Sequence, residues 1–168
     1  TIHLSDDASS YAQVLKSSGY FDTLVFSDED RKRNAMYKAE AARKKTKESM
    51  QFVSLENYYR YLEMEVAVNE ADEFSIPRIA QLTQKTNQFN LTTKRYSESD
   101  IVEFSESPKS DVLYLSLKDQ FGDYGIVGAA ILLNENSKLT IDTFLLSCRI
   151  IGRGAEDVLL KTCINYGL

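Results

Sequence analysis

The chain has 168 residues, of which 43% are hydrophobic and 27% are charged, and its net charge is −5 at neutral pH. This composition excludes a disordered chain and is typical of a globular domain with one core. The longest apolar run, residues 125–133, is shorter than the ~20 residues that a membrane-spanning helix needs. The acidic balance, without a recognition motif, argues against nucleic acid. We therefore expect neither a membrane nor a nucleic acid as partner.

Residues 1–50 are predicted to be a helical extension. Ser5, Asp6 and Asp7 can cap a helix that carries apolar residues at helical spacing, and residues 27–30 form a capping box for a second helix. This second helix is densely basic, which indicates either a solvated connector or a docking surface for an acidic partner. Its basic residues are Arg31, Lys32, Arg33, Lys38, Arg43, Lys44, Lys45 and Lys47.

Residues 51–168 are predicted to form the main domain. It begins with a short helix at 55–62 and a strand at 64–68, whose alternate residues are apolar. Ser75 is then predicted to cap a helix with Pro77 in its first turn, where the missing N–H costs nothing. A second capping box, residues 97–100, opens the next helix.

Three strands and a helix complete the domain. Residues 112–117, 125–133 and 138–147 are rich in β-forming residues and are separated by turn residues, which predicts an antiparallel meander. Residues 156–165 follow as a helix. The predicted fold class is therefore α/β, with a mainly antiparallel sheet flanked by helices.

The connection before this last helix is the strongest candidate for a binding site. Its two glycines allow a tight turn and a close approach of the backbone to a ligand. The free N–H groups and the dipole at the start of the helix then favour an anion such as a pyrophosphate. An ordinary strand-to-helix connection is the alternative. The residues predicted to bind a phosphate-bearing cofactor are Arg149, Gly152, Arg153, Gly154 and Ala155.

Two side chains close to this connection are catalytic candidates. Cys148 precedes Arg149 and the helix start, both of which favour a nucleophilic thiolate, but a small buried thiol is the alternative. Asp142 lies within a strand, where an aspartate is unfavourable unless it pairs or faces a cleft. It is either a general base with a raised pKa or an outward-facing residue.

A polar segment between two predicted helices is a candidate for substrate binding. Uncharged amides and hydroxyls can hydrogen-bond a polyol or a carbonyl, although the same residues also serve turns and caps. The candidates are Thr86, Asn87, Gln88 and Asn90. Asp123, in the sequence Phe-Gly-Asp-Tyr-Gly, belongs either to a hairpin turn or to the wall of a cleft.

The cysteines and the single histidine give no support for a metal site. Cys148 and Cys163 have neither zinc-ligand spacing nor a disulfide framework, so a reducing cytoplasm is the expected location. His3 lacks Cys or His neighbours that could complete a site.

Residues 149–155 are called the glycine connection below. Their pattern, an arginine, two further residues, a glycine, one residue and a second glycine, resembles the acyl-CoA pyrophosphate loop of the GNAT acyltransferases. The flanking sequences, residues 142–149, 121–125 and 86–92, resemble the C-terminal part of FkbH-like proteins, which join a HAD-type phosphatase domain to a GNAT-like domain. The resemblance covers nearly the whole chain. A complete GNAT domain continues with further strands, so we expect this chain to be part of a larger protein.

The resemblance implies a specific chemistry. FkbH-like proteins load a glyceryl unit from a phosphorylated intermediate onto an acyl carrier protein. The implied cofactor is CoA or carrier-bound phosphopantetheine, and the implied partners are the acyl carrier protein and the HAD-like phosphatase domain of the same polypeptide. The Asp-x-Asp nucleophile motif of that phosphatase has no counterpart here, because neither residues 28–30 nor residues 5–7 follow the apolar strand that the motif requires. Phosphatase activity is therefore not expected of this chain alone. A non-catalytic scaffold and an ordinary acetyl-CoA-dependent N-acetyltransferase are the alternatives.

Overall fold

The computed structural model describes residues 7–19, 28–49, 54–135 and 138–166, and within 28–49 the side chains of residues 37–49. It divides into two compact units, Thr1–Lys38 and Ala39–Leu168. The predictions for His3, Ser5, Asp6, Ser27 and the side chains of Arg31, Lys32 and Arg33 lie outside the described residues.

The first unit is helical where it is described. A short 3-10 helix, Ala8–Ser10, leads into α1, Tyr11–Ser17. Asp7 caps this start, because its side chain accepts a hydrogen bond from the Ser9 N–H at 3.0 Å. The long helix α2, Asp28–Ser49, begins in this unit and continues into the second.

The second unit is built on one four-stranded antiparallel sheet with the order β1-β2-β3-β4. A short helix, α3 (Leu55–Tyr61), precedes the sheet. The strands are β1 (Glu65–Glu70), β2 (Ser110–Asp119), β3 (Gly122–Glu135) and β4 (Lys138–Leu146). The helices α4 (Ile76–Lys85) and α5 (Glu98–Glu106) connect β1 to β2, and α6 (Ala155–Tyr166) follows β4.

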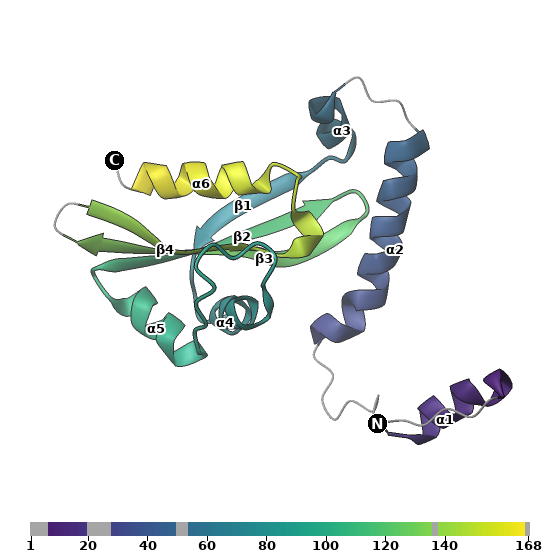
Figure 1. The fold of residues 1–168 in the computed structure, drawn as a ribbon. Coiled ribbons are helices and arrows are strands. Elements are labelled where there is room, and N and C mark those ends of the chain that lie inside the picture. The colour runs from purple at the N-terminus through teal and green to yellow at the C-terminus, as the bar shows by residue number, and fades with distance from the viewer. Residues whose placement is uncertain (1–6, 20–27, 50–53, 136–137, 167–168) are drawn as a thin grey trace. The chain divides into compact units, whose positions relative to one another are not determined.

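Helices cover both faces of the sheet (Figure 1). Alternate residues of a strand point to opposite faces, so β2 sends Leu113, Leu115 and Leu117 to the α6 side, where they meet Leu159. The neighbouring positions face the α4–α5 side, where Val112 joins a second core. The sheet therefore carries two apolar cores, which explains why β3 is apolar almost throughout.

The sequence predicted this architecture. The α/β class, the antiparallel meander and the flanking helices are confirmed. The capping box of α5 is present, since Ser97 and Asp100 exchange side-chain to backbone hydrogen bonds. The predicted side-chain cap at Ser75 is wrong. Ser75 precedes α4, but its hydroxyl instead donates to the Asp72 carbonyl at 2.9 Å and accepts from the Asp72 N–H at 2.7 Å.

A segment between α4 and α5 runs along the outer edge of β4. The Leu91 N–H donates to the Phe144 carbonyl at 3.1 Å, and the Leu146 N–H donates to the Phe89 carbonyl at 2.9 Å. Asn90 and Leu145 form an antiparallel bridge between these two bonds. The end of β4 that leads to the glycine connection is therefore hydrogen-bonded on both edges.

In the described part of the chain, no helix is both long and apolar enough to cross a membrane.

Candidate functional site

The glycine connection begins where β4 ends. The Ser147 N–H still donates to the Val127 carbonyl of β3 at 2.7 Å, and a 3-10 turn, Cys148–Ile150, follows. Gly152 and Gly154 have φ angles of +76° and +74°, which a residue with a Cβ rarely adopts. Ala155 then opens α6. The predicted strand, two-glycine turn and helix are therefore present in the predicted order.

The side chain between the two glycines is held by carboxylates. Arg153 is 7% exposed, its Nη2 donates to Glu40 Oε2 at 2.7 Å, and its Nη1 lies 3.6 Å from Asp119 Oδ2. Glu40 belongs to α2 and Asp119 ends β2. The prediction that Arg153 binds a cofactor stays a prediction, and in this structure its guanidinium is engaged within the protein.

A second arginine binds the same two carboxylates. Arg43 of α2 donates from Nε and Nη2 to both oxygens of Asp119, at 2.8 and 3.0 Å, and from Nη1 to Glu40 at 2.6 Å. Asp119 also accepts from the Phe121 N–H at 2.9 Å. Its carboxylate thus lies between two guanidiniums.

Aromatic rings surround this cluster. The guanidinium carbons of Arg43 and Arg153 lie 5.0 and 5.1 Å from the centroid of the Tyr124 ring, and Arg43 lies 5.4 Å from that of Phe121. Cations over ring faces at these distances are attracted by the ring quadrupole. Charge pairing and aromatic packing together offset part of the cost of burying two arginines, while Arg153 Nη1 and Tyr124 Oη are buried without a hydrogen-bond partner among the described residues.

An apolar cleft of about 290 Å³ lies beside the start of α6. Phe89, Leu91 and Thr92 form one wall, Ile141 and Phe144 of β4 form the floor, and Glu156, Asp157 and Leu160 of α6 form the other wall. The cleft has room for an acyl chain or the thiol arm of a cofactor. The two carboxylates of α6 lie in its first turn, where they interact favourably with the helix dipole but oppose a second anion.

The two cysteines differ in exposure. Cys148 is exposed in the turn after β4, so it is accessible to a substrate. Cys163 is fully buried in the core under α6, and burial raises the pKa of its thiol to about 11. Only Cys148 is placed to act as a nucleophile, and this role stays a prediction.

Asp142 is a buried residue at an irregularity in β4. Ile131 of β3 pairs with Thr143 and Leu132 pairs with Ile141, so Asp142 has no partner across the strands. Its carboxylate accepts hydrogen bonds from Lys94 Nζ at 2.5 Å, from Tyr96 Oη at 2.7 Å and from Thr143 Oγ1 at 3.0 Å. The unfavourable strand position is thus explained by pairing.

The pKa of Asp142 is lowered, which corrects the sequence prediction. Burial raises this pKa, but the hydrogen bonds from Lys94, Tyr96 and Thr143 outweigh burial. The expected raised pKa is therefore wrong, and the carboxylate is a weak base. The same contact, after burial, contributes to raising the pKa of Tyr96 to about 12.

We expect Asp142→Asn to reduce stability at neutral pH and to flatten its acid dependence. A folded-state pKa below the usual 3.8 stabilises the fold above that value and loses this contribution as pH falls. The substitution should cost about 1–3 kcal/mol at pH 7. Urea unfolding of both proteins from pH 7 to pH 3 measures the difference, which should shrink toward acid. A constant difference would contradict the assignment.

The polar segment between α4 and α5 uses much of its hydrogen-bonding capacity on itself. Asn90 Nδ2 donates to the Thr86 carbonyl at 3.3 Å, and Asn90 Oδ1 accepts from the Thr93 N–H at 3.0 Å. Asn87 accepts from Arg95, whereas Gln88 is exposed. Binding of a substrate by Thr86, Asn87, Gln88 and Asn90 stays a prediction.

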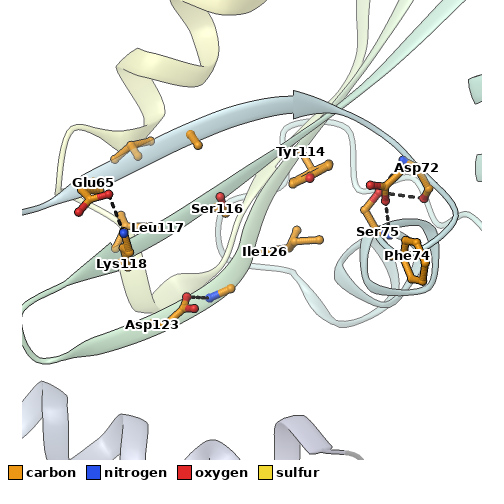
Figure 2. Close-up of a pocket in the computed structure, with 13 residues that line it drawn as sticks. Glu65, Asp72, Phe74, Ser75, Tyr114, Ser116, Leu117, Lys118, Asp123 and Ile126 are labelled. Atoms are coloured by element: carbon orange, nitrogen blue, oxygen red, sulfur yellow. Dashed lines mark hydrogen bonds and ion pairs between the residues drawn. The ribbon is translucent and has the colours of Figure 1, made fainter.

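Asp123 lies at a different cleft, of about 410 Å³, on the α4 side of β1, β2 and β3. Its carboxylate accepts from the Gly125 N–H at 2.7 Å, so it shapes the start of β3. Figure 2 shows this bond and, among the residues that line the same cleft, the ion pair of Glu65 with its neighbour Lys118 on the adjacent strand, at 2.7 Å. Asp123 thus lies in β3, where it pairs with Lys118 just after the hairpin turn, and it lines the cleft wall; its role toward a substrate stays a prediction.

Comparisons with known proteins give one structural likeness to report. No protein-family model matches the chain, and no curated protein sequence matches it. The ribosomal-protein-S18-alanine N-acetyltransferase from Escherichia coli is similar in structure, with a TM-score of 0.46 and 13% sequence identity over 61% of this chain. The match spans 59% of the acetyltransferase, which is less than two thirds of its length.

The candidate residues fall into separate groups. The residues from Cys148 to Ala155 lie together in one connection, and the apolar cleft beside it contains Thr92 of the polar segment. The Asp142 carboxylate is hydrogen-bonded by Lys94 and Tyr96. Asp123 lines the other cleft. Among the described residues, no group of three or more His, Cys, Asp or Glu side chains is arranged to hold a metal ion.

Sequence reasoning missed the residues that hold the glycine connection. Arg43 was one of eight basic residues in α2, and nothing in the local pattern distinguished it from the neighbouring lysines. Asp119 ends a strand, where an aspartate is ordinary turn chemistry. Only the preference of a buried ion pair for arginine over lysine could have pointed to Arg43.

Proposed function

We propose that this chain is an acyltransferase domain that binds a phosphopantetheine-bearing cofactor at its glycine connection. The observation that carries the proposal is the turn with two left-handed glycines, which joins β4 to α6 beside an apolar cleft. The backbone of Gly152, Gly154 and Ala155 would hold the phosphate, and the cleft would take the thiol arm or the acyl chain.

The specific reaction that we propose is transfer of a glyceryl-type acyl group to the phosphopantetheine of an acyl carrier protein. Support comes from the resemblance of residues 86–92, 121–125 and 142–149 to FkbH-like proteins. The thiolate of the exposed Cys148 would attack the carbonyl of an activated glyceryl donor and expel the donor's leaving group, and the phosphopantetheine thiol would then attack this thioester and release the Cys148 thiolate. Arg149 would lie beside the cofactor phosphate. The basic helix α2 would contact the acidic carrier protein, and a HAD-like phosphatase domain of the same cytoplasmic polypeptide would supply the dephosphorylated unit.

A non-catalytic carrier-binding module is the second candidate. The observation that favours it is the pair of carboxylates, Glu156 and Asp157, in the first turn of α6, because they repel an anion where the phosphate would lie. An ordinary N-acetyltransferase that uses acetyl-CoA would share the cofactor site and differ in its acceptor. Binding of CoA therefore separates the scaffold from both acyltransferases.

Calorimetric titration with CoA and with a phosphopantetheinylated carrier protein tests the proposal. We expect the wild type to bind, and we expect Gly154→Trp to weaken binding by about tenfold or more, because the indole would fill the space above the turn. Failure of the wild type to bind either ligand would contradict a cofactor site.

Gly154→Ala is the matched control for backbone strain. It imposes the same unfavourable φ of +74°, but its Cβ would only touch Tyr59 Cε2 at 3.9 Å. Binding that falls equally in both variants would show that strain, rather than blocking of the site, causes the loss. Thermal unfolding of each variant confirms that the fold is retained.

A further inference from the structure

We infer that the C-terminal part of α2 is a clamp that sets the conformation of the glycine connection, with Arg43, Glu40 and Asp119 as positioning residues that act through Arg153. The inference deepens the proposed function and rests on it only for the consequence for cofactor binding. The contacts described above carry it, and all of them lie within the unit Ala39–Leu168.

The first step concerns how freely the connection could move without the clamp. Residues 151–154 form a turn in which two of the four positions are glycines with positive φ, so the backbone itself restrains them weakly. Two side chains hold this turn from outside. Tyr59 of α3 donates to the Gly152 carbonyl at 2.8 Å, and Arg153 extends into the buried cluster.

The second step concerns what Arg153 meets there. Glu40 Oε2 accepts from Arg43 at 2.6 Å and from Arg153 at 2.7 Å, so one carboxylate oxygen joins α2 to the connection. The Asp119 side chain is fully buried and is bound by Arg43 at two oxygens. Two arginines and two carboxylates form this cluster: Arg43 hydrogen-bonds both carboxylates, whereas Arg153 hydrogen-bonds Glu40 and lies 3.6 Å from Asp119.

The third step concerns rigidity. Asp119 is fixed by the Phe121 N–H at the tip of the β2–β3 hairpin, and that hairpin is tied to α3 because the Gln120 N–H donates to the Leu62 carbonyl at 2.9 Å. Tyr124 packs against both guanidiniums. Contacts from α2, α3 and the hairpin therefore fix the position of the glycine connection together. A displacement of α2 would move residues 152–154 through the ion pairs of Glu40 and Arg43.

Amide hydrogen exchange of the full chain tests this inference. In Asp119→Asn, which keeps the side-chain shape, and in Glu40→Gln, we expect exchange of the amides of residues 150–156 to rise about tenfold or more beyond the rise in β3 residues 129–132, whose amides report the loss of global stability. Glu48→Gln is the matched control, because it removes the same charge from α2 at an exposed pair with Lys44.

Two results would overturn the clamp. The first is unchanged exchange of residues 150–156 in both variants. The second is an equal increase in residues 150–156 and in β3, which would make the cluster a general stabiliser. If Asp119→Asn unfolds the chain, exchange in Glu40→Gln alone tests the inference. The Glu40 side chain is 55% exposed, so its replacement should destabilise the fold less.

A CoA titration of the same variants separates the clamp from the proposed function. We expect both clamp variants to weaken binding and Glu48→Gln to leave it unchanged. A wild type that binds no CoA would refute the cofactor site, while the exchange result would still decide whether α2 positions the connection. Faster exchange without weaker binding would show that the clamp does not position the connection for the cofactor and would overturn that part of the inference.

Discussion

Asp119→Ala is expected to lower the free energy of unfolding by about 3–5 kcal/mol, a large part of the 5–15 kcal/mol that holds a typical domain together. The Asp119 side chain is fully buried, and it compensates the charge of Arg43, whose side chain is 3% exposed. Among the residues that the structure describes, its removal leaves Glu40 as the one carboxylate partner of two buried guanidiniums. Urea unfolding at pH 7 measures the loss.

Glu65→Ala supplies the comparison on the same sheet. Glu65 pairs with Lys118, the residue before Asp119, but the two side chains are 68% and 57% exposed. Exposed pairs contribute about 0–1 kcal/mol, because water already solvates both charges. A similar loss in the two variants would show that burial of the Asp119 cluster contributes nothing beyond an ordinary ion pair.

The sequence was sufficient for the architecture because each strand and helix is specified by local patterns. Local patterns alone predicted these elements correctly: alternating apolar residues predicted β1, the capping box predicted the start of α5, and the continuous apolar run predicted β3. The antiparallel order of β2, β3 and β4 followed because the short connections between these strands allow little else.

The candidate site was harder to predict because its residues meet across the chain. Arg43 and Asp119 are 76 positions apart, and Glu40 and Arg153 are 113 apart. No local pattern encodes such a pair. Asp142 shows the same limit, since its odd strand position was visible in the sequence, whereas its partners Lys94 and Tyr96 lie 48 and 46 positions away. Their hydrogen bonds reverse the expected direction of its pKa.

Leu146→Ala is expected to cost about 2–5 kcal/mol, because it removes a large side chain from a packed core. Leu146 is fully buried, and it ends β4 immediately before the glycine connection. Its Cδ2 lies so close to Gly128 of β3 that a Cβ there would approach it to 3.1 Å. The cavity left by the substitution cannot be filled from Gly128, which has no side chain. Thermal or urea unfolding measures the cost.

Leu160→Ala separates the stability of the fold from the proposed function of the cleft. Leu160 is 41% exposed on α6 and lines the apolar cleft, so its truncation should change stability far less than Leu146→Ala does. If the cleft holds the thiol arm or acyl chain, the loss of apolar contact should weaken binding of an acyl-CoA severalfold. Unchanged acyl-CoA affinity would remove the cleft from the proposed site, whereas a stability loss equal to that of Leu146→Ala would mean that Leu160 is a core residue. The two variants together therefore test whether the apolar cleft lined by Leu160 binds an acyl-CoA or is an ordinary solvent-exposed face of α6.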